Sequence, residues 1–176
     1  MPPIRILVVD DSVVVRRILS DTLSKDPELE VVGLASDGRI ALSKIPVLRP
    51  NLVTLDVEMP VMDGLETLVE LRKSHPKLPV IMFSSLTENG AAATLEALAL
   101  GASDYATKPS NAGNPMVAIE RIQTELVPKI KALCRLAPVQ RVLARQSVRP
   151  VAQPQSRRAH PFEVVAIGAS TGGRMR

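Results

Sequence analysis

A chain of 176 residues, 45% of them hydrophobic, is long enough for one ordinary domain and a remainder, and it is too apolar for a disordered protein. A single cysteine excludes an internal disulfide and a cysteine-based zinc site, and an aromatic content of 2% argues against a surface that stacks nucleic-acid bases on aromatic rings. The net charge of +4 conceals a division: residues 1–125 carry 12 Lys and Arg against 17 Asp and Glu, whereas residues 126–162 carry 8 basic residues and no acid.

The first apolar run of the chain, Ile4–Val9, is interrupted by Arg5. This run is too short for the apolar core of a signal sequence and far too short for a membrane span. We therefore expect a soluble, cytoplasmic protein that does not insert into membranes.

Short apolar runs, which predict strands, alternate with segments whose apolar side chains recur at helical spacing. The expected strands are Ile4–Val9, Val31–Ala35, Leu52–Leu55, Val80–Phe83 and Asp104–Thr107. The expected helices are Val13–Leu23, Gly38–Leu48, Leu65–Lys73, Asn89–Leu100 and Val117–Leu136. Ser12 is placed to cap the first helix, Gly101 to end the fourth, and Pro128 to kink or shorten the last.

This alternation predicts an α/β fold: a doubly wound, five-stranded parallel sheet with helices on both faces. The corresponding flavodoxin-like strand order is 2-1-3-4-5. In such a sheet the functional site lies at the carboxyl ends of the strands.

Polar side chains follow four of the expected strands: Asp10 and Asp11 after the first, Asp56 after the third, Ser84 after the fourth and Lys108 after the fifth. Any one of the acids alone could be a solvated turn residue. As a set they converge at one edge of the sheet, where three carboxylates repel one another and need a cation. Mg²⁺ suits such an oxygen site, and phosphoryl transfer needs a metal and a fixed positive charge. The pattern therefore indicates Asp56 as nucleophile, Asp10 and Asp11 as metal ligands, and Lys108 with Ser84 as partners of the phosphoryl oxygens.

Four motifs in this order resemble those of two-component response-regulator receiver domains: VVDDS at 8–12, LDVEMPVMDG at 55–64, FSS at 83–85 and Lys108-Pro109. The resemblance covers about residues 4–125. It implies that Asp56 is the phospho-acceptor and that Asp10, Asp11 and Asp56 bind Mg²⁺ together with the backbone carbonyl of Glu58.

The same resemblance implies a conformational switch. Ser84 and Tyr105 match the family's switch pair, a hydroxyl drawn toward the phosphoryl group and an aromatic ring that follows it inward. Lys108 would contact the phosphoryl oxygens, and its bond to Pro109 is cis in the family. Taken by itself, Tyr105 in a short strand could equally be a half-buried packing residue.

The rest of the chain is divided by composition. Residues 136–162 are rich in Pro, Arg and Gln and predict a basic linker, and Glu163–Gly168 restarts a strand pattern. A Gly-rich turn with Ser170 follows. This turn could be a nucleophile elbow, a phosphate-binding loop or an ordinary turn in which the glycines serve the backbone alone.

A receiver followed by this linker and the sequence VVAIGASTGG at 164–173 resembles the chemotaxis receptor-glutamate methylesterases (CheB-type). The resemblance implies a receiver domain at 1–135, a linker at 136–162 and the truncated start of a serine-esterase effector at 163–176, with Ser170 as its nucleophile. The implied partners are a CheA-type histidine kinase, methyl-accepting chemotaxis receptors and the protein's own esterase domain.

The effector motif also departs from that family. The triad histidine and aspartate have no match in this chain, because His75 and His160 lie outside the matching region, so we expect the chain itself to lack esterase activity. The terminal Arg174-Met175-Arg176 departs from the family pattern and suggests a truncation or a cloning scar.

Other functions stay open at this stage. The chain could be a response regulator whose output is binding to a motor, a kinase or DNA, or a Mg²⁺-dependent phosphatase with the same sheet topology. The basic segment is expected to be a solvated linker rather than a nucleic-acid site, although it could also pack against the acidic receiver.

Overall fold

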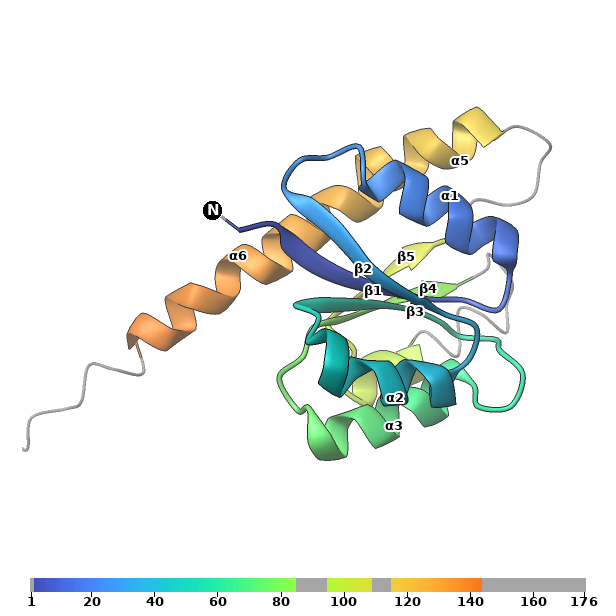
Figure 1. The fold of residues 1–176 in the computed structure, drawn as a ribbon. Helices are drawn as coiled ribbons and strands as arrows, with labels where there is room; N and C mark the ends of the chain where they lie inside the picture. Colours follow the sequence, from blue (N-terminus) through green and yellow to red (C-terminus); the bar gives the residue numbers. More distant parts are fainter. Residues whose placement is uncertain (1, 85–94, 109–114, 144–176) are drawn as a thin grey trace, which may run out of the picture. The chain divides into compact units, whose positions relative to one another are not determined.

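The computed structural model describes residues 2–84, 95–108 and 115–143, and its sheet agrees with the sequence prediction (Figure 1). Five parallel strands pair in the order β2-β1-β3-β4-β5, which confirms the doubly wound fold. The strands are β1 (Ile4–Val9), β2 (Leu29–Ala35), β3 (Leu52–Asp56), β4 (Val80–Ser84) and β5 (Asp104–Thr107).

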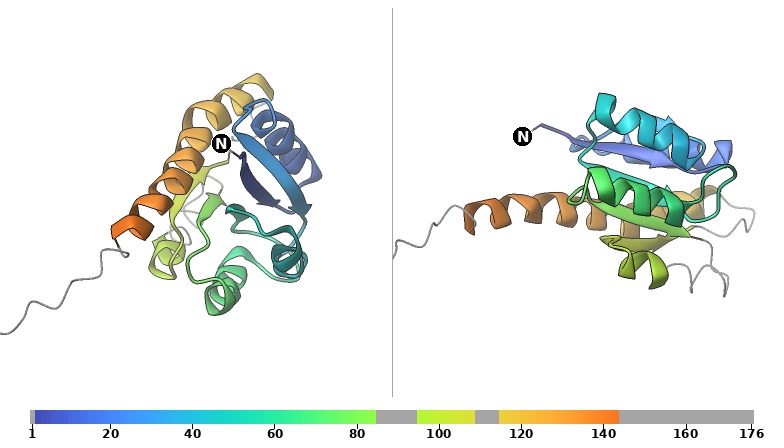
Figure 2. Two further views of the ribbon diagram at one scale, coloured as in Figure 1. Left: turned by 60° about the vertical axis from the view of Figure 1, so that its left-hand side comes forward. Right: turned by 90° about the horizontal axis from the view of Figure 1, so that it is seen from below.

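Helices cover both faces of this sheet (Figures 1 and 2). The helices α2 (Gly38–Leu48) and α3 (Gly64–Ser74) lie on one face. The other face carries α1 (Val13–Leu23) and a continuous helical stretch made of α5 (Pro115–Arg121), the π-helical turn η1 (Ile122–Leu126) and α6 (Val127–Leu143). Residues 95–99 form a further helical segment before β5. None of the helices in the described ranges is long and apolar enough to cross a bilayer.

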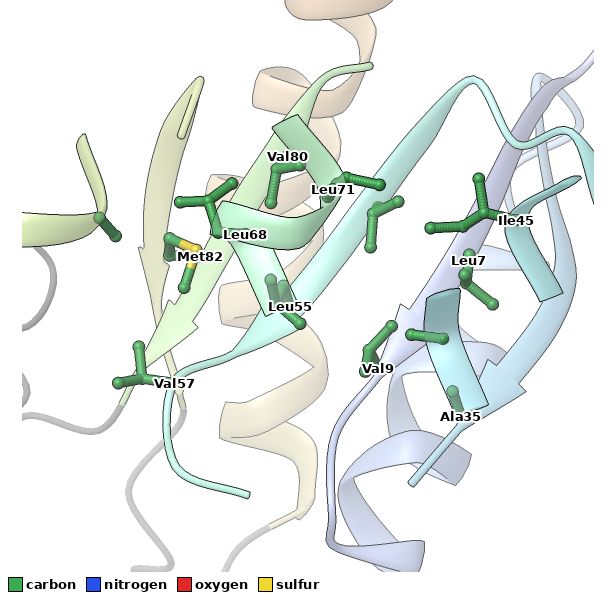
Figure 3. Packing of buried hydrophobic residues seen from close by; sticks show 13 residues of the cluster. Leu7, Val9, Ala35, Ile45, Leu55, Val57, Leu68, Leu71, Val80 and Met82 are labelled. Atoms are coloured by element: carbon green, nitrogen blue, oxygen red, sulfur yellow. The ribbon is translucent and has the colours of Figure 1, made fainter. Parts of the chain in front are cut away.

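The core is two apolar clusters, one on each face of the sheet. Side chains alternate along a strand, so Leu7 and Val9 of β1 pack into the cluster under α2 and α3, while Ile6 and Val8 pack into the cluster under α1 and α6. Figure 3 shows the first cluster, in which strand side chains meet those of the two helices. Because both faces are covered, the strands read as continuous apolar runs in the sequence.

Several predicted boundaries move by a few residues. β2 begins at Leu29, two residues before the prediction, and β3 and β4 each run one residue further, to Asp56 and Ser84. Ser12 caps α1 as predicted, its hydroxyl oxygen accepting the N–H of Val15 at 3.4 Å. Gly101, with φ +98°, follows the helical segment 95–99 as predicted, and the predicted start of that helix at Asn89 lies outside the described residues.

The last helix differs most from the prediction. Pro128 does not end it. The turn before the proline is π-helical, with the Val127 N–H donating to the Ile122 carbonyl, and this wider turn accommodates the proline within the continuous helical stretch. The helix then runs to Leu143 rather than ending at Leu136, so residues 136–143 of the predicted linker segment are helical. The strand predicted at 163–168 and Ser170 lie outside the described residues.

Candidate functional site

Three carboxylates meet at the carboxyl end of the sheet, as the strand topology predicts. Asp10 and Asp11 directly follow β1, and Asp56 is the last residue of β3, the strand paired with β1. Oxygen atoms of all three side chains lie within 4.8 Å of one another. Asp10 and Asp56 are buried, at 0% and 2% exposure, whereas Asp11 is open to solvent. The cluster is therefore buried on the side of Asp10 and Asp56 and accessible to solvent on the side of Asp11.

Lys108 supplies the positive charge of this site. Its Nζ lies 2.9 Å from Asp10 Oδ2 and 2.6 Å from Asp56 Oδ2, and within the described parts of the chain neither oxygen accepts any other hydrogen bond. The backbone of Lys108 is fixed as well, because its N–H donates to the carbonyl of Ser84 at 2.7 Å. One ammonium group is therefore shared by two buried carboxylates.

Burial and neighbouring charges shift the pKa values of Asp56 and Lys108. Burial raises the pKa of Asp56 to about 6, and the neighbouring Asp10 charge adds to that rise while Lys108 opposes it. For Lys108, burial lowers the pKa, but hydrogen bonds and charge attraction from Asp10 and Asp56 outweigh this effect and leave the pKa above its usual value. When all three carboxylates are ionised, the site holds two negative charges more than Lys108 can compensate, and this excess favours a bound cation.

Backbone groups orient the buried acids. Asp10 Oδ1 accepts the N–H of Ser12 at 2.9 Å, and Asp56 Oδ1 accepts the N–H of Glu58 at 3.3 Å. Each of these bonds reaches two residues along the chain, the usual way in which Asp fixes a turn. The remaining oxygen of each carboxylate, Oδ2, consequently faces Lys108.

Arg16 is a contributor that the sequence analysis missed. Its Nη1 donates to the backbone carbonyls of Asp10 at 2.6 Å and Asp11 at 3.0 Å, which ties the acidic loop to α1. The available signal was its position one turn into the helix that directly follows the acids. This arginine fixes the backbone of the loop rather than its carboxylates.

Gly64 is a second missed contributor, and it allows the start of α3 to touch the end of β3. The Gly64 N–H donates to the Val57 carbonyl at 2.9 Å, and a Cβ at this position would lie 2.1 Å from the Asp56 carbonyl oxygen. Real side chains do not tolerate such a distance, so any larger residue would push α3 away from the strand that ends in Asp56.

We expect Gly64→Ala to lower the free energy of unfolding by about 2–3 kcal/mol, because the clash is with backbone that cannot move aside. Chemical denaturation of the variant and the wild type measures this loss. Gly33→Ala is the matched control, since its added Cβ would meet the flexible end of the Leu48 side chain at 2.5 Å. Equal losses in the two variants would contradict the role assigned to Gly64.

The remaining predicted site residues lie at different depths. Ser84 ends β4 and is buried, at 6% exposure, while Tyr105 on the neighbouring strand β5 is 47% exposed. Glu58 lies in the loop after β3 and contacts Asp56 through its own N–H. Ser85, Pro109 with its bond to Lys108, and Ser170 fall outside the described residues.

Comparison with known proteins gives the same assignment for most of the chain. The sequence profile of the family described as "Response regulator receiver domain" matches residues 6–120. The response regulator domain of Thermotoga maritima CheB superposes with a TM-score of 0.67 at 43% identity, over 76% of this chain and 97% of that one.

Full-length relatives extend the similarity beyond this domain. Proteins named protein-glutamate methylesterase/protein-glutamine glutaminase from Trichodesmium erythraeum and a Nocardioides strain are 50% and 49% identical over 98% of this chain, which covers 50% and 49% of their length. The chain thus spans about half the length of the curated relatives it matches. From the matching profile and the structural similarity together, we conclude that this chain belongs to the response regulator receiver domain family.

Proposed function

We propose that the receiver domain accepts a phosphoryl group on Asp56 from a histidine kinase in a Mg²⁺-dependent reaction. The observation that carries this proposal is the buried pair of strand-end carboxylates, Asp10 and Asp56, held by the single ammonium of Lys108. A carboxylate can attack phosphorus only if the charge that gathers around it is neutralised. The cluster has the residue types for that task.

The donor set fits a hard divalent cation. Asp10, Asp11 and Asp56 offer only oxygen atoms, all within 4.8 Å of one another, and the Oδ2 atoms of Asp10 and Asp56 have Lys108 as their one partner in the described structure. Asp10, Asp11, Asp56 and the backbone carbonyl of Glu58 would hold the ion. When bound, Mg²⁺ neutralises carboxylate and phosphoryl oxygens.

In the proposed reaction the Asp56 carboxylate attacks the donor phosphorus and the donor group leaves, so that an acyl phosphate forms on Asp56. Lys108 is already in contact with Asp56 and would neutralise the phosphoryl oxygens once they arrive. The added charge, roughly −1.5 to −2, would draw the Ser84 hydroxyl toward it and allow Tyr105 to move inward.

For the whole protein we propose a phosphorylation-controlled chemotaxis methylesterase. A basic linker at 136–162 would connect the receiver to an effector that begins near residue 163, in which Ser170 would be the nucleophile acting on receptor glutamate methyl esters, with glutamine deamidation as a second reaction. Phosphorylation would relieve inhibition of that esterase. The support is the similarity to relatives of this name over 98% of the chain. A CheA-type kinase and methyl-accepting receptors are the proposed partners, and the cytoplasm is the proposed location.

The described basic residues favour this account over a DNA-binding output. Lys129 pairs with Asp104, Lys131 with Asp26 and Glu28, and Arg135 also with Glu28. Because these basic side chains form ion pairs within the domain, they contribute little to the attraction of a DNA phosphate backbone. The pairs hold the first part of α6 against acids of the receiver domain.

The proposed function is tested by incubating the full chain with acetyl phosphate and measuring its intact mass. We expect a gain of one phosphoryl group that requires Mg²⁺ and is lost in Asp56→Asn. Asp11→Asn should slow the gain by at least tenfold because it removes one metal ligand, while the folded structure stays intact since Asp11 is exposed. A gain of the same size without Mg²⁺, or in Asp56→Asn, would contradict the proposal.

A further inference from the structure

The edge strand β5 ends the sheet, and side chains cover its free edge. The backbone of Tyr105 faces away from β4. Its N–H donates to Oδ1 of the adjacent residue Asp104 at 2.7 Å, and its carbonyl accepts a hydrogen bond from Lys129 Nζ. In an edge strand, the N–H and carbonyl of every second residue point away from the sheet and have no strand to pair with. The two side-chain contacts satisfy these groups in Tyr105.

Lys129 makes several contacts at this place at once. It comes from α6, 24 residues along the chain, and its Nζ lies 3.0 Å from Asp104 Oδ1 and 4.8 Å from the centre of the Tyr105 ring. One ammonium group thus bonds the Tyr105 carbonyl, pairs with the adjacent acid and lies over the aromatic face. Tyr105 is 47% exposed in this arrangement.

We propose that Lys129 is a positioning residue that holds the Tyr105 ring in its outward position. This inference rests on the proposed function, in which the ring moves inward on phosphorylation. An inward movement separates the ring from the ammonium group and so removes the cation–π contact. Lys129 therefore favours the unphosphorylated arrangement and links the position of Tyr105 to α6, the helix that leads toward the proposed effector.

The size of this bias follows from the contacts. An inward movement of the ring breaks the cation–π contact but leaves the ion pair with Asp104 in place, so the cation–π contact alone favours the outward ring, by a factor of about two to five. By reciprocity, a variant without this bias binds a phosphoryl mimic more tightly by the same factor, about two- to fivefold. The effect is large enough for a titration to resolve.

The chain provides its own reporter, because Tyr105 is its single tyrosine and it has no tryptophan. The experiment titrates the full chain with beryllofluoride, a phosphoryl mimic, at fixed Mg²⁺ and follows tyrosine fluorescence and its quenching by acrylamide. In the wild type, quenching should decrease on binding as the ring moves inward. In Lys129→Met the apparent dissociation constant should fall about two- to fivefold, and Lys129→Arg should restore it to near the wild-type value.

Lys131→Met is the matched control. It removes the same charge from the same helix, but Lys131 contacts Asp26 and Glu28 and not Tyr105. An unchanged dissociation constant in Lys129→Met, an equal shift in both variants, or wild-type quenching that does not decrease on binding would each overturn the inference.

The experiment distinguishes failure of the proposed function from failure of the inference about Lys129. If the wild type bound no beryllofluoride, phosphoryl acceptance at Asp56 would be in doubt, and the role of Lys129 would be decided on the metal-free protein by fluorescence anisotropy. Lower anisotropy in Lys129→Met than in Lys131→Met, reporting a freed ring, supports the contact, and equal anisotropy overturns it.

Discussion

Replacing Asp56 with asparagine is expected to stabilise the metal-free protein, raising its free energy of unfolding by about 2–3 kcal/mol at pH 7. The carboxylate is 2% exposed and lies beside Asp10, and burial raises its pKa from the ordinary aspartate range to about 6. A carboxylate whose pKa is raised by folding is less favourable when charged in the folded state than in the unfolded state. The neutral amide removes that cost while keeping nearly the same shape.

The pH dependence has a definite sign. Because folded Asp56 holds its proton more tightly than unfolded Asp56, its contribution to stability is complete below about pH 4 and is lost as the pH rises through about 6. The difference in unfolding free energy between Asp56→Asn and the wild type should therefore grow between about pH 4 and pH 6 and stay constant above that. Asp26 and Glu28, whose pKa values are lowered by Lys131, act in the opposite direction but are common to both proteins.

Denaturant unfolding of both proteins in a chelating buffer, repeated across this pH range, measures the difference. Saturating Mg²⁺ should reduce or reverse it, because the ion stabilises the protein that retains the full set of carboxylates. A metal-free Asp56→Asn protein less stable than the wild type at pH 7 would contradict the electrostatic description of the site.

Removing the other partner of this ion pair should have the opposite effect. We expect Lys108→Met to lower the free energy of unfolding by about 3 kcal/mol at pH 7 without Mg²⁺, because it leaves two buried carboxylates without a counter-charge. The loss should diminish as the pH falls and the carboxylates take up protons. Thermal or denaturant unfolding in the same chelating buffer measures it.

The double variant Lys108→Met/Asp56→Asn should recover at least half of that loss, since only one buried carboxylate then lacks its partner. Lys44→Met serves as a control: Lys44 donates to the Leu34 carbonyl at the outer edge of β2, and its removal should cost less than about 1 kcal/mol. A double variant as unstable as Lys108→Met would show that the lysine acts through packing and not through charge.

The sequence was sufficient for the sheet and for the convergence of the acids, for one physical reason. Parallel strands covered on both faces are continuous apolar runs, and their carboxyl ends lie at one edge of the sheet. Asp10 after β1 and Asp56 at the end of the adjacent strand β3 must therefore be neighbours, and Lys108 after β5 lies at the same edge, within reach of its long side chain. The sequence alone therefore predicts that Asp10, Asp56 and Lys108 lie close together.

Contacts that depend on side-chain direction or on close backbone approach could not be predicted in this way. The contact of Gly64 with the end of β3 depends on how α3 enters the sheet, and the place of Lys129 over Tyr105 depends on where α6 runs. The continuation of that helix through Pro128 required the π-helical turn before it, for which the local sequence gives no periodic signal. These features follow from tertiary packing rather than from local pattern.

The most direct test of the proposed phosphorylation identifies the side chain that accepts the phosphoryl group. The full chain is treated with acetyl phosphate and Mg²⁺, reduced with borohydride so that an aspartyl phosphate becomes homoserine, and mapped by peptide mass spectrometry. We predict homoserine at position 56 alone, and none when Mg²⁺ is withheld. Homoserine at Asp10 or Asp11, or no modification of position 56 under conditions in which Mg²⁺ is bound, would contradict it.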